Sequence, residues 1–380
     1  MKGIPERLGK FVGRLDHLLI WLVNLCAASS VLMLYTIWEN HLSEKVASND
    51  WLVQLISMSL GLLGCLVVSA IDYHKLAKFW FLYAPVALGL VALTFTSLGY
   101  GREGADDVAW VDLGFVQIQP SEILKIAFLL TFSLHISKTG DKLNKPLHLL
   151  LLLLHGAIPA GIVALQGDYG TAIVFAAMIL FMLFSAGLSI WYLLGGLAML
   201  PVAGWAMWTF VFSDVHRERI LVLLNPGTDP LGLEYQQDLG LRALRAGGLF
   251  GLGFDAEAYV KVPEMHNDFI FAYIGQLFGF IGAVLVLLIM AVICLRIFAD
   301  SRAAKDTMGK TICMGVLAIL FTHYIMNIGM VLKVLPVIGI PLPFFSAGGT
   351  AMLSMYLCIG LVISAYTHNI KKYRVFYDAE

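Results

Sequence analysis

Charged residues are scarce in this sequence. Lys, Arg, Asp and Glu make up only 13% of the 380 residues, against 59% hydrophobic residues, and the mean hydropathy is +0.82. A soluble domain must cover itself with polar surface, so this balance excludes a soluble globular protein and indicates an integral membrane protein. The formal net charge of −1 offers no basic domain of the kind that binds phosphates, and we expect no nucleic-acid partner.

Cysteine is also rare and is not arranged in pairs. The five cysteines lie in or at the edge of apolar runs: Cys26, Cys65, Cys294, Cys313 and Cys358. Neither disulfide bonds nor a zinc site is therefore predicted. The first apolar run, residues 15–38, follows a basic start and is longer than the core of a typical signal peptide, so we interpret it as an uncleaved first span.

Long apolar runs dominate what is present. A helix needs about 20 apolar residues to cross the hydrocarbon, and the runs do not alternate as the strands of a barrel would. The sequence therefore predicts an all-α, polytopic membrane protein with about ten transmembrane helices. The expected spans are 17–38, 51–71, 78–98, 120–137, 147–166, 169–187, 190–212, 269–296, 309–332 and 345–367.

The distribution of Lys and Arg predicts the orientation. An even number of spans puts both termini on one side, and the segments on that side carry 16 Lys and Arg residues against 8 on the other. By the positive-inside rule, both termini are expected in the cytoplasm. The segment 213–267, between spans seven and eight, is then a large extracytoplasmic loop, and residues 1–380 form a single membrane domain. Loops of this length are more often functional than merely connecting.

Several acids stand at the predicted outer ends of the spans. Asp268 directly precedes the uncharged stretch 269–295 in "VPEMHNDFIFAYIG". An aspartate in this position is either a helix N-cap or a functional carboxylate, and the residues alone favour the cap. Taken singly, His266 and Glu264 are ordinary loop residues, and Asp168 in "QGDYGTA" is another candidate cap.

One charged pair is expected within the membrane. In "QIQPSEILKIA", Pro120 and Glu122 are typical of a helix start, and Lys125 follows Glu122 on the same helix face. Ionisable groups at this depth are usually paired and functional, although a purely structural ion pair between two spans fits equally.

These fragments, in this order, resemble the SEDS family of shape, elongation, division and sporulation proteins, most closely its RodA branch. The resemblance runs from about residue 53 to residue 373. It is carried by "WVDLGFVQIQPSEILKIA", "QGDYGTA", "RERILVLLNPGTDPLGLEYQ" with "GGLFGLGF", "VPEMHNDFIFAYIG" and "NIGMVLKVLPVIGIPLPFFSAGGT". The last two motifs are highly specific for the family.

The resemblance implies a peptidoglycan glycosyltransferase with ten spans, which polymerises lipid II on the outer face of the bacterial cytoplasmic membrane for cell-wall elongation and cell shape. It also implies a complex with a class B penicillin-binding transpeptidase, and it makes Asp268 the catalytic residue. Such a carboxylate can act as the general base on the attacking sugar hydroxyl. The departing diphosphate then needs a cation, either Arg or Lys or a divalent ion such as magnesium or manganese.

We assign further residues to this expected site. The candidates for binding the substrate and its pyrophosphate are Arg217, Arg219, Lys125, Glu122 and His266. The candidates for supporting roles are Asp168, Gln119, Glu264 and Lys333. Arg217 and Arg219 fit equally well as interfacial anchors that reach toward lipid headgroups.

The chain departs from the family pattern at several positions. Ala109 stands where relatives carry Arg, Asn267 where they carry Thr, and Gln276 with Leu277 where they carry two glutamates. Lys333 replaces a glycine, and we hypothesise that it restores a lost positive charge.

Two other functions fit a protein with buried charges and ten spans. One is a lipid II flippase or transporter, although the sequence shows no internal repeat and no interrupted spans at matching positions. The other is a catalytically weak scaffold that holds a class B penicillin-binding protein, which the departures at Ala109 and Leu277 keep open.

Overall fold

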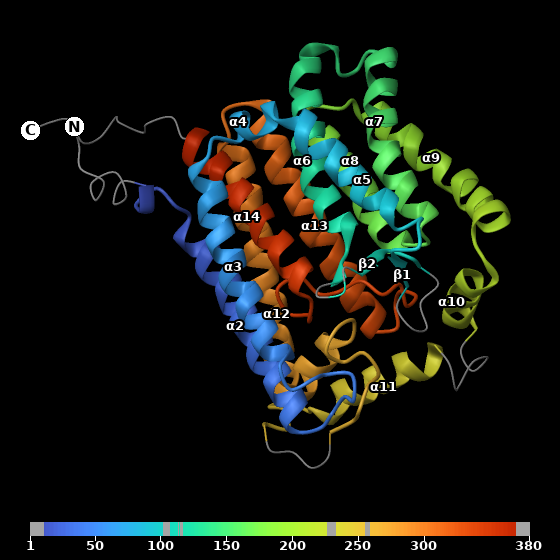
Figure 1. Ribbon diagram of the computed structural model, residues 1–380. Helices are drawn as coiled ribbons and strands as arrows, with labels where there is room; N and C mark the ends of the chain where they lie inside the picture. The colour runs from blue at the N-terminus through green and yellow to red at the C-terminus, as the bar shows by residue number, and fades with distance from the viewer. Residues whose placement is uncertain are drawn as a thin grey trace, which may run out of the picture.

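The computed structural model describes residues 11–101, 107–112, 114, 117–225, 233–254 and 259–369 (Figure 1). Helices follow one another along most of the chain. The first half contains α2 (His17–Glu39), α3 (Asp50–Ala70), α4 (Tyr73–Lys78), α5 (Trp80–Leu93), α6 (Pro120–Thr139), η1 (Gly140–Lys142), α7 (Pro146–Leu165) and α8 (Tyr169–Ser185). The second half contains α9 (Ile190–Ala206), η2 (Met207–Val211), α10 (Asp214–Leu224), α11 (Leu233–Ala246), α12 (Ile270–Ala303), α13 (Thr307–Val331) and α14 (Gly349–Asn369).

The helices match the apolar runs. Among the residues described, eight helices are long and apolar enough to cross a membrane, and the shorter apolar helices α5 and α8 lie where the other two spans are expected. The all-α, polytopic membrane fold is therefore confirmed, while the count of ten crossings stays a prediction. Sequence capping signals explain several starts, because Pro120 and Pro146 open α6 and α7 at positions where a helix needs no backbone N–H.

A small antiparallel sheet was not predicted. It joins β1 (Gly99–Tyr100), β2 (Trp110–Asp112) and β3 (Gln117–Ile118) in the order β1-β2-β3. Val111 pairs with Gly99 on one side and with Ile118 on the other. Strands of two or three residues carry no readable alternation, so the sequence pattern gave no sign of them.

The two ends of the bundle differ in what they carry. Figure 1 shows α4 at one end, with the sheet, α10 and α11 at the opposite end. Segment 213–267 was predicted as one long loop; in the part that the structure describes it contains two helices, α10 and α11. Residues 226–232 and 255–258 of that segment, including much of the "NPGTDPLGLEY" motif, and both termini lie outside the described residues.

α13 lies at the centre of the packing. It contacts α6, α8, α12 and α14, and α14 in turn packs along α3. Most of α13 is buried, from Met308 near its start to Val331 at its end. α9 is the opposite case, because none of its residues is buried.

α12 is interrupted near the end that carries Asp268. Gly279 has φ 69° and ψ −168°, a conformation that favours glycine and breaks the helical hydrogen-bond ladder. Loop 247–253 supplies the missing partners through four backbone bonds: Phe280 N to Gly248 O (2.9 Å), Ile281 N to Leu249 O (3.2 Å), Leu252 N to Gln276 O (2.9 Å) and Gly253 N to Leu277 O (3.2 Å). One span is thus interrupted, which the sequence did not predict.

The side chain of Gln276 binds the backbone of Val260, which follows loop 247–253 in the chain. Gln276 is fully buried, accepts a hydrogen bond from Val260 N (2.7 Å) and donates one to Val260 O (3.3 Å). An amide can do both, whereas an ionised glutamate only accepts. Leu277 is buried beside it. Gln276, at a position where the resemblance led us to expect glutamate, therefore forms an uncharged link between α12 and Val260.

Candidate active site

Asp268 lies in the turn 263–269, directly before α12. Phe269 is the N-cap of α12 and no side chain caps the helix, so the interpretation of Asp268 as a helix cap is wrong. Asp268 is half-buried. A Cβ placed on Gly339 would lie 3.5 Å from its Oδ2, so the carboxylate lies against the backbone of the segment 332–348, which we name the α13–α14 loop.

A side chain of α13 holds the main chain of Asp268. The Asn327 side-chain amide donates to Asp268 O and to Ile340 O, both at 2.8 Å. Asn327 is fully buried, so both bonds form away from water and leaving either carbonyl without a donor would be costly. One side chain therefore fixes the backbone of Asp268 relative to the α13–α14 loop.

A second network fixes the residues just before Asp268. Ser346 Oγ donates to Asn267 O (2.6 Å) and accepts from Leu342 N (2.7 Å), while Ala347 N donates to His266 O (2.9 Å). Gln54 of α3 donates to Ser346 O (3.0 Å) and accepts from Gly348 N (3.2 Å). The turn and the loop are therefore joined to each other and to α3.

The predicted pair Glu122 and Lys125 forms a buried ion pair. Their side chains are 3% and 1% exposed, and Lys125 Nζ lies 2.7 Å from Glu122 Oε1. Ser354 of α14 donates to the other oxygen, Glu122 Oε2. The pair therefore links α6 to α14, as the structural interpretation of the sequence allowed.

Asp168 and Gln119 meet at the end of the bundle that carries Asp268. Asp168 caps α8 as predicted, accepting from Thr171 N at 2.9 Å, and its Oδ2 accepts from the Gln119 amide at 3.2 Å. Burial raises the pKa of the Asp168 carboxyl, against the effect of the Thr171 hydrogen bonds. A Cβ on Gly170 would come within 2.8 Å of Ile340, so the start of α8 packs on the α13–α14 loop.

The two arginines have different surroundings. Arg217 donates to the carbonyls of Trp208 (3.0 Å) and Thr209 (3.4 Å) and lies 3.3 Å from Asp214, so it caps the carbonyl end of η2. Arg219 contacts Val337 O at 3.5 Å. Of the two arginines, Arg219 is therefore the one that contacts the α13–α14 loop, against which Asp268 also lies.

Lys333 is paired with acids of α11. Its Nζ lies 3.0 Å from Glu234 Oε1 and 2.7 Å from Asp238 Oδ1. Gln237 of the same helix donates to Met330 O and Leu335 O at 2.9 and 3.0 Å. These contacts join α11 to the end of α13, and whether Lys333 also contacts substrate stays a prediction.

Glu264 and His266 lie at the rim of the turn. Glu264 Oε1 pairs with Lys45 at 2.6 Å, and its Oε2 lies 3.8 Å from His266 Nε2. The sequence grouped these two residues with Asp268, and the structure places all three in one turn. None of these contacts assigns either residue a role in binding substrate.

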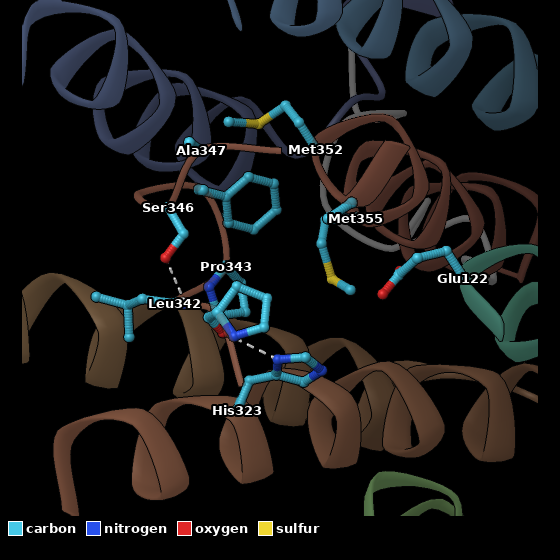
Figure 2. A pocket seen from close by; sticks show the side chains of 11 residues that line it. Glu122, His323, Leu342, Pro343, Ser346, Ala347, Met352 and Met355 are labelled. Atoms are coloured by element: carbon cyan, nitrogen blue, oxygen red, sulfur yellow. Dashed lines mark hydrogen bonds between the residues drawn. The ribbon is translucent and has the colours of Figure 1, made fainter. Parts of the chain in front are cut away.

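A small cavity lies inside the bundle, between the ion pair and the α13–α14 loop. Figure 2 shows Glu122 and His323 beside it, together with loop residues from Leu342 to Ala347 and two methionines of α14. Its volume is about 20 Å³, which is room for one water molecule but not for a sugar. A saccharide must therefore bind outside this cavity.

A divalent cation is the other expected source of positive charge. In the described ranges, no group of three or more His, Cys, Asp or Glu side chains lies close enough to hold a metal ion. Magnesium, however, commonly binds through one or two carboxylates together with substrate phosphates and water. Asp268 fits that mode as a single carboxylate.

The sequence matches the family model of the cell cycle proteins FtsW, RodA and SpoVE over residues 16–371. The chain belongs to this family. The match confirms the resemblance to the SEDS proteins that the motifs indicated.

Named relatives cover most of the chain. The chain is 34% identical over 319 residues to peptidoglycan glycosyltransferase MrdB of Escherichia coli strain K12. The aligned region covers 82% of this chain and 84% of MrdB. The chain is also 29% identical over 366 residues to stage V sporulation protein E of Bacillus subtilis strain 168, covering 92% and 96%.

Solved structures support the fold. A chain of a peptidoglycan synthase complex that coordinates polymerization and crosslinking matches with a TM-score of 0.77 and 26% identity, over 93% of this chain and 97% of that one. The rod shape determining protein RodA of Thermus thermophilus matches with a TM-score of 0.68 and 24% identity, over 94% and 98%.

Sequence reasoning missed the residues that hold the site together. Gln54, His323, Asn327 and Ser354 lie within apolar helices and are buried. A polar or ionisable side chain inside a span is itself a functional signal. That signal was present for His323 and Asn327, one helical turn apart, but their partners lie in a loop that the pattern did not position.

Proposed function

We propose that this chain polymerises lipid II into glycan strands of peptidoglycan, with Asp268 as the general base. It is a glycosyltransferase of the multi-pass membrane type, as its family and named relatives support. The observation that carries the assignment is the anchoring of Asp268. Its carbonyl is held at 2.8 Å by buried Asn327, and its carboxylate is half-buried at the end of a membrane-spanning helix.

The chemistry needs one proton acceptor and one source of positive charge. Asp268 accepts the proton of the GlcNAc 4-hydroxyl as that oxygen forms a bond to the anomeric carbon of a MurNAc. The bond from that carbon to undecaprenyl pyrophosphate breaks, and the diphosphate leaves with the electron pair. A carboxylate within hydrogen-bond reach accelerates such a transfer by roughly 10²–10⁴-fold.

Positive charge stabilises the departing diphosphate. Arg219, which lies against the α13–α14 loop, is the better-supported candidate, because Arg217 is used at the end of η2 and Lys125 is paired inside the bundle. A magnesium or manganese ion held by Asp268 and the substrate phosphates would supply the same charge.

The charge distribution supports the proposed cellular setting. We place both termini in the cytoplasm and Asp268 at the outer face of the bacterial cytoplasmic membrane, because the segments on the terminal side carry 16 Lys and Arg residues and those on the other side carry 8. Lipid II, with its tail in lipid and its sugars in water, suits a carboxylate at the end of a span. A class B penicillin-binding transpeptidase is the proposed partner, in line with a structural match in a peptidoglycan synthase complex.

Reconstitution in liposomes that contain lipid II, with the transpeptidase partner, tests the proposal. Wild-type protein should form glycan polymer, and Asp268→Asn, which keeps the side-chain size but removes the base, should not. Transbilayer movement of lipid II without polymer would favour a flippase. Neither activity in the wild type would favour a scaffold, and full polymerisation by Asp268→Asn would remove this residue from catalysis.

A further inference from the structure

His323 is a buried imidazole that the proposed reaction does not use. It lies in α13 and is 3% exposed. Its Nδ1 lies 3.0 Å from the carbonyl oxygen of Pro341 (Figure 2). A carbonyl only accepts, so Nδ1 carries the proton of this hydrogen bond, and in the neutral ring Nε2 is then an acceptor.

His323 and Asn327 form one unit on α13. They are four residues apart, so their side chains lie on the same helix face. Asn327 holds Ile340 O and His323 holds Pro341 O, which are consecutive carbonyls of the α13–α14 loop. Gly339, the next residue back along the loop, lies against the Asp268 carboxylate. A shift of the loop at Pro341 therefore reaches the position of Asp268.

Glu122 and Lys125 are the charged groups that face His323 from α6. They do not need the imidazole, because Glu122 already accepts from Lys125 and from Ser354. The other elements around the cavity present only loop residues from Pro341 to Ala347 and the apolar side chains of Ala351, Met352 and Met355. The ion pair is thus complete without His323, and the loop is the partner that depends on it.

The space beside His323 is a small cavity. Nε2 has no hydrogen-bond partner within the described part of the chain, and His323 lines the cavity beside Glu122. The cavity volume of about 20 Å³ admits one water molecule, which would donate a hydrogen bond to Nε2. A saccharide does not fit there, so any effect of His323 on the reaction passes through the loop.

We propose that His323 is a positioning residue for Asp268: its Nδ1–H holds the Pro341 carbonyl and so fixes the loop against which the carboxylate lies. This inference rests on the proposed function of Asp268. It assigns His323 no contact with substrate. The hydrogen bond to Pro341, rather than the bulk or the charge of the ring, is the property that matters.

Three substitutions separate these properties. In His323→Asn the amide nitrogen stands near the position of Nδ1 and can still donate to Pro341, whereas in His323→Gln it stands near the position of Nε2. His323→Leu keeps volume and removes both nitrogens. Tyr324→Phe is the matched control on α13, because the Tyr324 hydroxyl is buried and has no hydrogen-bond partner in the described ranges.

Lipid II polymerisation is measured for each full-length variant in complex with the transpeptidase, with kcat and KM obtained separately. His323→Leu and His323→Gln should lower kcat roughly tenfold, the size of one lost hydrogen bond that positions a reacting group, with KM unchanged. His323→Asn should stay within about threefold of the wild type, since it keeps that bond. Tyr324→Phe should match the wild type.

Two results would overturn the positioning role. One is full activity of His323→Leu. The other is equal impairment of the Asn and Leu variants while both remain monodisperse with a wild-type melting temperature. Asp268→Asn is assayed in the same series. If it remains active, the proposed function itself fails, whereas an inactive Asp268→Asn beside a fully active His323→Leu rejects only the inference about His323.

Discussion

α13 and the span formed by α9 and η2 are both apolar and long enough to cross a membrane, yet they meet different surroundings. In α13, 72% of the most apolar stretch is buried inside the protein, whereas in the span formed by α9 and η2 the buried share is 0%. α13 packs on α6, α8, α11, α12 and α14, whereas the main contact of α9 is with the adjoining η2. Apolar sequence thus serves two purposes here, packing against protein and facing lipid.

The difference explains where the functional polar groups lie. A buried polar side chain is stable only with a partner, and protein supplies partners that lipid does not. α13 can therefore carry His323 and Asn327, whose partners come from the α13–α14 loop and the turn of Asp268. α9, with no buried residue, has no comparable anchor. α13 therefore holds the turn of the candidate residue Asp268, and α9 does not.

The largest effect is expected where charge is buried beside α13. Glu122→Gln leaves Lys125, which is 1% exposed, as a buried charge without its counter-ion. Breaking such a pair costs about 3–5 kcal/mol of folding free energy. The melting temperature in detergent should therefore fall strongly. The double variant Glu122→Gln/Lys125→Met, which removes both charges, should recover much of the lost melting temperature. A Glu122→Gln variant as stable as the wild type would contradict the ion pair.

A matched pair of aliphatic substitutions tests the comparison itself. Ile319 in α13 is 0% exposed, and Leu197 in α9 is 62% exposed. Ile319→Ala leaves a cavity and should cost about 2–5 kcal/mol, whereas Leu197→Ala should change stability by less than about 0.5 kcal/mol. Thermal unfolding of both variants in one detergent checks this. Equal losses would show that α9 packs against protein after all.

A small effect is also expected just beyond the end of α13, where Lys333 is partly exposed. Lys333 is 18% exposed and its partner Asp238 is 42% exposed, so Lys333→Met should cost only about 0–1 kcal/mol. Burial lowers the pKa of Lys333, but the hydrogen bonds and charges of Asp238 and Glu234 outweigh it and raise the pKa above its ordinary value of 10.5.

The sign of the pH dependence follows from that shift. Because the folded protein binds this proton more tightly, the contribution of Lys333 is complete below pH 10.5 and is lost as the pH rises through the folded-state pKa. The stability difference between the wild type and Lys333→Met should therefore be constant from pH 7 to pH 9 and should shrink in high salt. A difference that grows with salt or with rising pH would contradict the ion pairs.

Much of the fold was readable from the sequence, for a physical reason. Apolar runs of about 20 residues leave the backbone few alternatives to a helix, so the predicted bounds of spans such as 309–332 lie within a few residues of the observed Thr307–Val331. Two local helix-start signals were also readable from the sequence. The cap at Asp168 and the start at Pro120 depend only on neighbouring residues.

What the sequence did not reveal depends on distant partners. Asn327 contacts Asp268 across 59 residues, and Ser354 contacts Glu122 across 232. No periodicity encodes such pairings. The break at Gly279 was missed because a glycine within an apolar run is compatible with a continuous span; the break exists because loop 247–253 supplies its hydrogen bonds.

In the proposed reaction, the Asp268 carboxylate removes a proton in the bond-forming step. The most direct measurement is a single-turnover rate of glycosyl transfer from lipid II, with wild type and Asp268→Asn compared at saturating substrate. We expect a rate loss of roughly 10²–10⁴-fold with lipid II binding retained, because the general base has been removed. A rate within about threefold of the wild type, or a loss explained entirely by weaker binding, would contradict it.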